Sequence, residues 1–182
     1  MTDSMNAYDM FYRHFLHPDS GDVRDGCPLD LVDKLQGSDV QRAEDELIRR
    51  VSTTDHWPAQ ALGRLKSKKA LPTLRKVLKK AKGSVLAYTA LSIWDTDHDP
   101  AMCRAVAAES RRVRTKLIYP FRTSALIDIA FCLSRIDCDP ARKELGILSE
   151  LPDYLVSYNA RRLAGRPQRF WEKDSTKPVE PG

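Results

Sequence analysis

The sequence predicts an all-α fold built from stacked helix pairs, and three observations support this. Residues that favour helices dominate the composition, and glycine occurs only eight times among 182 residues. In the stretch 61–82, apolar residues recur at helical spacing beside a densely basic set of positions. A pattern of small residues, a polar turn and an amphipathic segment also recurs along the chain, which is typical of helical repeats.

The length and composition indicate one domain followed by a short tail. We expect residues 1–173 to form a single helical-repeat domain and residues 174–182 to be a disordered tail. No apolar stretch reaches 18 residues, so no membrane-spanning helix is expected. The N-terminus lacks a basic start followed by an apolar core, so no secretory signal is expected either.

Four cysteines occur at irregular spacing, with no C-x-x-C pair, at Cys27, Cys103, Cys132 and Cys138. Three of them fall in segments with a helical pattern, where buried free thiols are the simpler interpretation. Free thiols fit a reducing compartment, so we expect a cytoplasmic protein.

The N-terminal part predicts three helices of unequal length. A helix is expected over 5–17, followed by a connection at 18–28 that is rich in Pro, Gly and Asp. A short helix follows over 28–36 and ends at Gly37. Ser38 then has the position of an N-cap for a helix that continues to about residue 52.

The repeated pattern divides the rest of the chain into helix pairs, most clearly at 59–82, 86–107 and 125–148. In each unit, a helix with small residues ends on two apolar residues three positions apart. A short polar turn and a second amphipathic helix follow. The apolar pairs are Leu62/Leu65, Leu91/Trp94 and Leu133/Ile136. The segment 107–122 lengthens the third unit and departs from the period.

Two turns share a helix start signal, in which an aspartate stands directly before a proline. Asp99-Pro100 and Asp139-Pro140 each place an N-capping carboxylate before a residue whose fixed φ suits the first helical position. The apolar positions of all units together predict a core, which comprises Leu62, Leu65, Leu71, Leu74, Leu78, Leu91, Trp94, Ala105, Leu126, Ile129, Leu133 and Leu148.

The run A-L-G-R-L at 61–65, followed by A-L-P-T-L-R-K-V-L at 70–78, resembles the consensus of HEAT-like repeats of the short bacterial type. The resemblance is close at 59–82, weaker at 86–107 and 125–148, and covers about half of the chain. It implies a right-handed α-α superhelix of antiparallel helix pairs. In that family the second helix of each unit lines the concave side, which implies that the basic positions of 69–80 lie on or beside that surface.

Charge is distributed unevenly along the chain, although the net charge is only +5. Nine basic residues and no acidic one lie between His56 and Trp94, whereas the preceding segment 24–55 is acidic. A second basic cluster occupies 111–122. Such a surface would attract an anionic partner. The candidate binding residues are Lys69, Lys76, Lys79, Lys80, Arg111, Arg112, Arg114 and Lys116.

No motif for catalysis, a cofactor or a metal is found. The segment 95–99, with three aspartates and a histidine, lacks the glycine and glutamate that a calcium-binding EF-hand loop requires. His14 and His17 lie three residues apart without a Cys or Glu that could complete a metal site. P-loop, G-x-S-x-G and G-x-G-x-x-G patterns do not occur, so we expect a protein that is not an enzyme.

Two kinds of partner fit a basic helical-repeat protein without catalytic motifs. The first is an acidic protein, and small helical-repeat proteins of this size resemble immunity proteins that occlude a bacterial toxin. This resemblance concerns size and architecture only. The second is nucleic acid, because some HEAT-like proteins, including alkylpurine DNA glycosylases, hold DNA along a cationic concave face. No aromatic residue is interleaved with the lysines for base stacking, which favours the first alternative.

Overall fold

The computed structural model describes residues 6–18, 28–116 and 121–168, and every regular element within these ranges is a helix. The expectation of an all-α fold is therefore confirmed. None of the described helices is long and apolar enough to span a membrane. The expected tail at 174–182 and the thiol of Cys27 lie outside the described residues.

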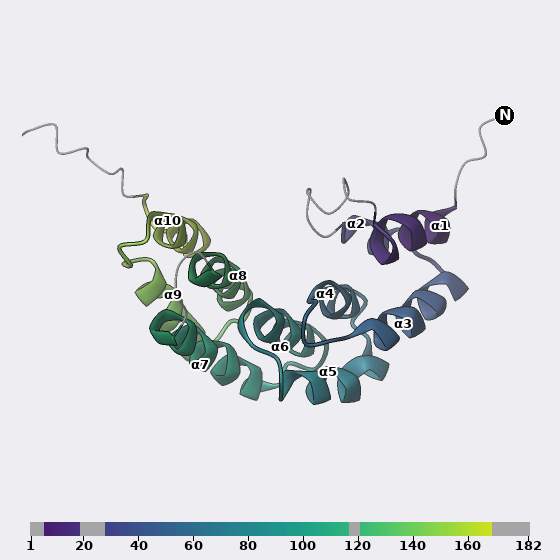
Figure 1. Cartoon of the computed structure of the whole chain (residues 1–182), viewed down its shortest axis with the longest axis horizontal. Coiled ribbons are helices and arrows are strands. Elements are labelled where there is room, and N and C mark those ends of the chain that lie inside the picture. The colour runs from purple at the N-terminus through teal and green to yellow at the C-terminus, as the bar shows by residue number, and fades with distance from the viewer. Residues whose placement is uncertain (1–5, 19–27, 117–120, 169–182) are drawn as a thin grey trace, which may run out of the picture.

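The helices form two rows along a curved arc (Figure 1). The inner row contains α4 (Trp57–Arg64), α6 (Gly83–Asp97), α8 (Phe121–Arg135) and α10 (Tyr154–Leu163). The outer row contains α3 (Ser38–Arg50), α5 (Leu71–Leu78), α7 (Pro100–Lys116) and α9 (Asp139–Leu148). Each inner helix packs against the next inner helix, and from α5 onward each helix also packs against the next one in the sequence, so the chain builds the arc stepwise.

Two short N-terminal elements pack at one end of the arc. α1 (Ala7–Phe11) continues into the π-helical turn η1 (Tyr12–Leu16), and α2 (Asp30–Asp33) contacts α1 and α4. The prediction that Ser38 caps α3 is wrong, because Ser38 is already the first helical residue. Gly37 precedes it with φ +55°, a conformation that residues with a side chain rarely adopt.

The two Asp-Pro turns start their helices in different ways. Before α7, the Asp99 carboxylate accepts a hydrogen bond from the Ala101 N–H at 2.9 Å, as predicted for an N-cap. Before α9, the cap is Cys138, whose Sγ accepts from the Ala141 N–H. The prediction for Asp139 is therefore wrong by one residue, and its carboxylate binds Arg142 instead.

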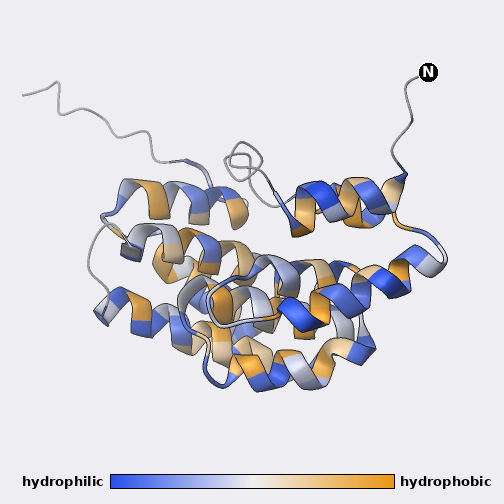
Figure 2. Ribbon diagram, turned by 45° about the vertical axis from the view of Figure 1, so that its right-hand side comes forward, coloured by the Kyte–Doolittle hydropathy of each residue, from blue (hydrophilic) through white to orange (hydrophobic). Residues whose placement is uncertain are grey.

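The core lies between the two rows and continues under the N-terminal helices. Hydrophobic and hydrophilic bands alternate along most helices in Figure 2, as expected for helices that bury one side. Of the predicted core residues, seven are buried, namely Leu62, Leu74, Leu91, Leu126, Ile129, Leu133 and Leu148. Four are partly buried against this core, namely Leu65, Leu71, Leu78 and Trp94. Ala105 is the exception, since Val106 and Cys103 face the core on α7 in its place.

Inner-row helices α4 and α6 approach each other unusually closely. A Cβ atom on Gly63 would lie 2.8 Å from the Cα, Cβ and Oγ of Ser92. The Ser92 hydroxyl is 2.7 Å from the carbonyl oxygen of Ala59 in α4, and it donates a hydrogen bond across the helix interface. Small residues at this repeat position therefore set the distance between neighbouring units.

A disulfide joins Cys103 in α7 to Cys138 at the start of α9. The expectation of free thiols is wrong for these two residues, because the fold brings together side chains that are 35 residues apart. Cys132 is a buried free thiol, as predicted, and burial raises its pKa well above the ordinary value. With the disulfide present, cysteine usage no longer argues for a reducing compartment.

Candidate binding surfaces

Four lysines on α5 and on the turn after it form an exposed cationic surface, which we call the lysine surface: Lys76, Lys79, Lys80 and Lys82. None of them has an ion-pair partner among the described residues. α5 belongs to the outer row (Figure 1), so the expectation that the basic helix lines the concave side is wrong. The charges face outward because the apolar side of α5, with Leu74 at its centre, packs against α6.

Other cations of the same acid-free segment are neutralised by aspartates from distant helices. Arg64 binds both oxygens of Asp33 at 2.7 Å, and Lys69 binds Asp45 at 2.5 Å. Hydrogen bonds from these cations lower the pKa of both aspartates, and the bond to Asp45 raises the pKa of Lys69. Lys69, a predicted binding residue, is thus engaged within the protein.

Arg75, in the middle of α5, ties that helix to the connection between α6 and α7. Its guanidinium donates to Asp97 at 2.6 Å and to Asp99 at 3.2 Å. Asp99 has a lowered pKa, chiefly because it accepts the Ala101 N–H and also because it accepts from Arg75. Asp97 and Asp99 therefore serve as ion-pair partners of Arg75, and Asp99 also caps α7.

Three arginines of the predicted second basic cluster form ion pairs within the protein. The carboxylate of Glu144 in α9, only 3% exposed, accepts from Arg111 at 2.9 Å and from Arg114 at 3.0 Å. Arg112 forms a bidentate pair with Glu109, whose carboxylate also accepts the N–H of Gly83 at the start of α6. Among the cluster's candidates, Lys116 alone is exposed without an ion-pair partner in the described ranges.

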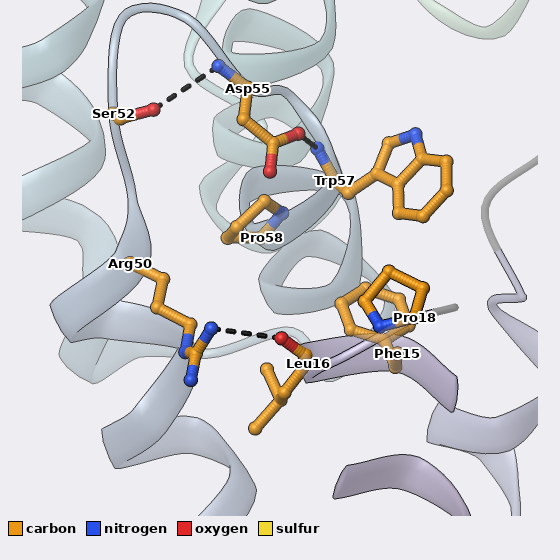
Figure 3. A pocket seen from close by; sticks show the side chains of 8 residues that line it. All are labelled: Phe15, Leu16, Pro18, Arg50, Ser52, Asp55, Trp57 and Pro58. Atoms are coloured by element: carbon orange, nitrogen blue, oxygen red, sulfur yellow. Dashed lines mark hydrogen bonds between the residues drawn. The ribbon is translucent and has the colours of Figure 1, made fainter. Parts of the chain in front are cut away.

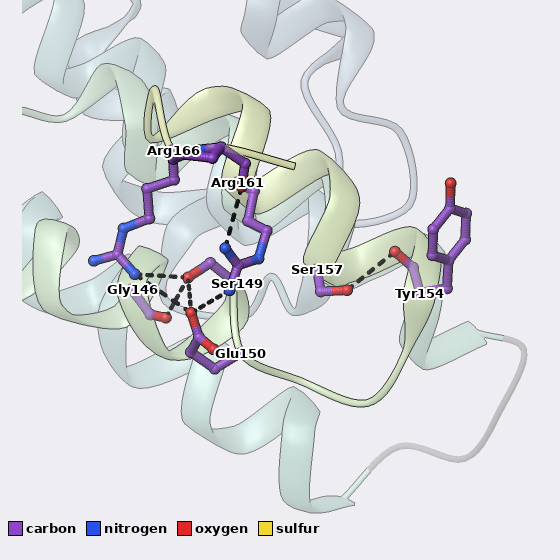
Figure 4. Close-up of polar contacts among 8 residues, drawn as sticks. Gly146, Ser149, Glu150, Tyr154, Ser157, Arg161 and Arg166 are labelled. Atoms are coloured by element: carbon purple, nitrogen blue, oxygen red, sulfur yellow. Dashed lines mark hydrogen bonds and ion pairs between the residues drawn. The ribbon is translucent and has the colours of Figure 1, made fainter. Parts of the chain in front are cut away.

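The C-terminal arginines also hold the fold together (Figure 4). Arg161, 8% exposed, donates to Glu150 at 2.5 Å and to the carbonyl oxygen of Pro167 at 3.2 Å. Arg166 donates to the hydroxyl of Ser149 at 3.0 Å. These contacts of Arg161 and Arg166 connect α10 and the residues after it to the end of α9.

The inner row contains a polar cluster that sequence reasoning missed. The ring of His56 lies on Tyr88, with centroids 4.6 Å apart, and the Tyr88 hydroxyl donates to Asp128 at 3.2 Å. Gln60 Nε2 lies 2.8 Å from Nδ1 of His56, and an amide NH2 only donates, so Nδ1 accepts. Burial lowers the pKa of His56, while the carboxylates of Asp128 and Asp55 act in the opposite direction.

A small pocket of about 100 Å³ lies beside this cluster, lined by Leu29, Gln60, Arg64, Tyr88, Leu91, Ser92, Asp95, Phe131 and Arg135. Burial raises the pKa of Asp95, and nearby Arg135 partly offsets this effect. Since the contributing helices α4, α6 and α8 are distant in sequence, no local motif could indicate this arrangement.

The described residues include no group of three or more His, Cys, Asp or Glu side chains arranged to hold a metal ion. His98, within the aspartate-rich segment, has φ +50° and ends α6 as its C-cap. Its ring packs edge-on against Trp94, with centroids 5.6 Å apart.

Comparisons with known proteins add no family assignment. No family model, no curated protein and no solved structure matches the chain. Function therefore has to be inferred from the side chains described above.

Proposed function

We propose that this chain is a non-enzymatic protein-interaction module with a HEAT-like, right-handed α-α superhelix, and that its lysine surface binds an acidic partner protein. The two rows of helices along an arc support the superhelix (Figure 1). Repeats of this kind stack pairwise and present extended surfaces to their partners. An immunity-type role, in which the module occludes a toxin, is the form of this function that we favour, and the cytoplasm is its proposed location.

One observation carries the proposal. Lys76, Lys79, Lys80 and Lys82 are exposed and have no acidic partner in the described part of the chain, whereas Arg64, Lys69 and Arg75 nearby are all paired. An uncompensated cluster of like charge raises the local potential, which speeds association with an acidic surface and selects against basic ones.

Nucleic acid is the alternative partner of the same lysines. Against it, the described large apolar side chains that are exposed lie on η1, α8 and α10 rather than beside the lysines, so the lysine surface offers no platform for base stacking. Contacts to phosphates alone would give an affinity that falls steeply with salt.

Fluorescence anisotropy can test the proposal with two labelled probes, a polyglutamate peptide and a mixed-sequence DNA duplex, at about 50 and 200 mM salt. The double variant Lys76→Glu/Lys80→Glu should weaken polyglutamate binding at least about tenfold. The matched control Arg13→Glu/Lys143→Glu makes the same charge change at exposed residues of η1 and α9 and should change it little. Equal losses in both variants would refute a localised surface, and stronger binding of the duplex would favour nucleic acid.

The immunity-type role needs a separate experiment. The wild-type protein should recover one acidic protein from a lysate of the source cell or of a competing strain, and Lys76→Glu/Lys80→Glu should fail to recover it. Recovery of no such protein would exclude this role, while the anisotropy result would still decide whether the lysine surface binds acidic polypeptides.

A further inference from the structure

A pocket of about 500 Å³ lies between the N-terminal helices and the loop that leads into α4 (Figure 3). Five apolar residues line it together with three polar ones: Phe15, Leu16, Pro18, Trp57 and Pro58, and Arg50, Ser52 and Asp55. This volume falls in the range of small-molecule sites, which are mostly apolar with a few convergent polar groups. The lysine surface shares no residue with this pocket.

The apolar wall is held in place by packing. Phe15 and Leu16 are only 4% and 6% exposed, so the core fixes their positions. The rings of Phe15 and Trp57 lie 6.3 Å apart and tilted, in the range of favourable aromatic pairs. Pro18 and Pro58 add two rigid rings. A flat apolar group could therefore bind without first opening the wall.

Two opposite charges border the pocket and do not neutralise each other. Arg50, at the end of α3, donates to the Leu16 carbonyl at 2.9 Å and lies 3.0 Å from Nε2 of His17. A guanidinium has five N–H donors, and the remaining ones have no acceptor among the described residues. No ion pair joins Arg50 to Asp55 in the described structure, and Figure 3 shows them on different sides of the gap.

Asp55 is fixed so that one carboxylate oxygen remains available. Its Oδ1 accepts the Trp57 N–H at 2.9 Å, and its own N–H donates to the Ser52 hydroxyl at 3.1 Å. The second oxygen has no hydrogen bond with any described residue and lies on the pocket side in Figure 3. The side chain therefore binds the first N–H of α4 and still presents negative charge to the pocket.

We propose that this pocket binds a small zwitterion with an apolar body, such as a free aromatic amino acid or an apolar dipeptide. The ligand's carboxylate would accept hydrogen bonds from Arg50, and its ammonium group would donate to Asp55. Its apolar side chain would pack against Trp57 and the neighbouring rings. A neutral apolar ligand would desolvate both charges without replacing their hydrogen bonds, and a ligand of one charge would meet a like charge in the site.

Trp57 provides the reporter for a direct test. The chain has three tryptophans, so the variant Trp94→Phe/Trp171→Phe leaves Trp57 as the single indole. L-phenylalanine and L-leucyl-L-leucine are titrated to millimolar concentration, each against its N-acetylated amide, which is neutral. A saturable change in Trp57 emission is expected for at least one zwitterion, and the one that binds shows whether the ligand is an amino acid or a dipeptide. The neutral form of that ligand should bind at least about tenfold more weakly. Equal responses to both forms, or no response to either zwitterion, would overturn the proposal.

The charge of Asp55 can be removed without removing its hydrogen bond to α4, because an asparagine oxygen also accepts the Trp57 N–H. Asp55→Asn should weaken zwitterion binding about tenfold at unchanged melting temperature. The control Asp137→Asn alters an exposed carboxylate before α9 and should leave binding unchanged. Unchanged binding in a folded Asp55→Asn variant would refute the role of Asp55. If Asp55→Asn does not fold, the proposal is decided by the titrations of the single-tryptophan protein, in which each zwitterion is compared with its neutral amide.

Discussion

Gly63 in α4 lies against Ser92 in α6 with no room for a side chain between them. Any Cβ at position 63 would come within 2.8 Å of three Ser92 atoms, two of which belong to the rigid part of that residue. The contact also places the Ser92 hydroxyl within hydrogen-bond reach of α4. The two helices can therefore keep their distance only while position 63 is glycine.

Gly63→Ala should consequently destabilise the protein by about 1–3 kcal/mol, the usual effect of forcing extra volume into a packed interface. Urea unfolding followed by circular dichroism would measure the change. Gly146→Ala is the matched control, because a Cβ there would meet only the end of the Arg166 side chain, at 3.3 Å. Equal losses in the two variants would contradict the close contact.

Glu144→Gln should lower the free energy of unfolding by about 2 kcal/mol. The substitution leaves Arg111 and Arg114 without their counter-charge at a buried position. Because Arg111 is more than half exposed, the expected loss is smaller than for a fully buried pair. Urea unfolding measures it, with Lys76→Gln as the control at an exposed site, where a change within about 0.5 kcal/mol is expected. A negligible effect of Glu144→Gln would mean that these arginines are free to bind a partner.

Removal of the disulfide should destabilise the protein by about 3–4 kcal/mol in the chain-entropy model, given its 35-residue separation. Cys103→Ser, compared with the wild type in thermal unfolding, measures this effect. Alkylation of the unfolded, unreduced protein followed by mass spectrometry checks the bond itself. Cys103 and Cys138 should resist alkylation, whereas Cys132 should react. Reaction at all three would show that the bond does not form.

Acid should weaken the packing of His56 on Tyr88. Because burial lowers the pKa of His56 below its ordinary value of 6.5, folding favours the neutral ring. The resulting stability is present above pH 6.5 and is lost as the pH falls through the lower pKa of the folded state. His56→Phe keeps a ring on Tyr88 but cannot titrate. Urea unfolding at about pH 7.5 and 5 should show a larger loss for the wild type than for this variant.

The sequence predicted the helix pairs well because their signal is repeated and local. In successive units, the dipeptide A-L or C-L is followed by a small residue, which is Gly63, Ser92 or Ser134. The structure explains this pattern for the first two, since they meet at a helix crossing. Eleven of the twelve core residues predicted from apolar spacing lie in the core or pack against it. The prediction failed at Ala105, where the side of α7 that packs is shifted by one residue.

The binding surface could be predicted only in part, because the sequence shows how charged residues are spaced along the chain but not which of them meet in the folded protein. Asp33, Asp45 and Glu144 come from other helices and neutralise cations that appeared unpaired in sequence. The same limit applies to the cap of α9, where Cys138 takes the place expected for Asp139 while it is bound to a distant cysteine. The pocket at Trp57 also joins segments with no shared motif.

The disulfide between α7 and the start of α9 would change how the chain responds to a stretching force. If the two ends were pulled apart, tension would pass from residue 103 to residue 138 through the bond and bypass both the rest of α7 and the whole of α8. The bypassed span would otherwise contribute roughly 120 Å of extended length. While the disulfide is intact, α8 is thus not stretched, and the residues between the two cysteines could extend only after the bond is reduced.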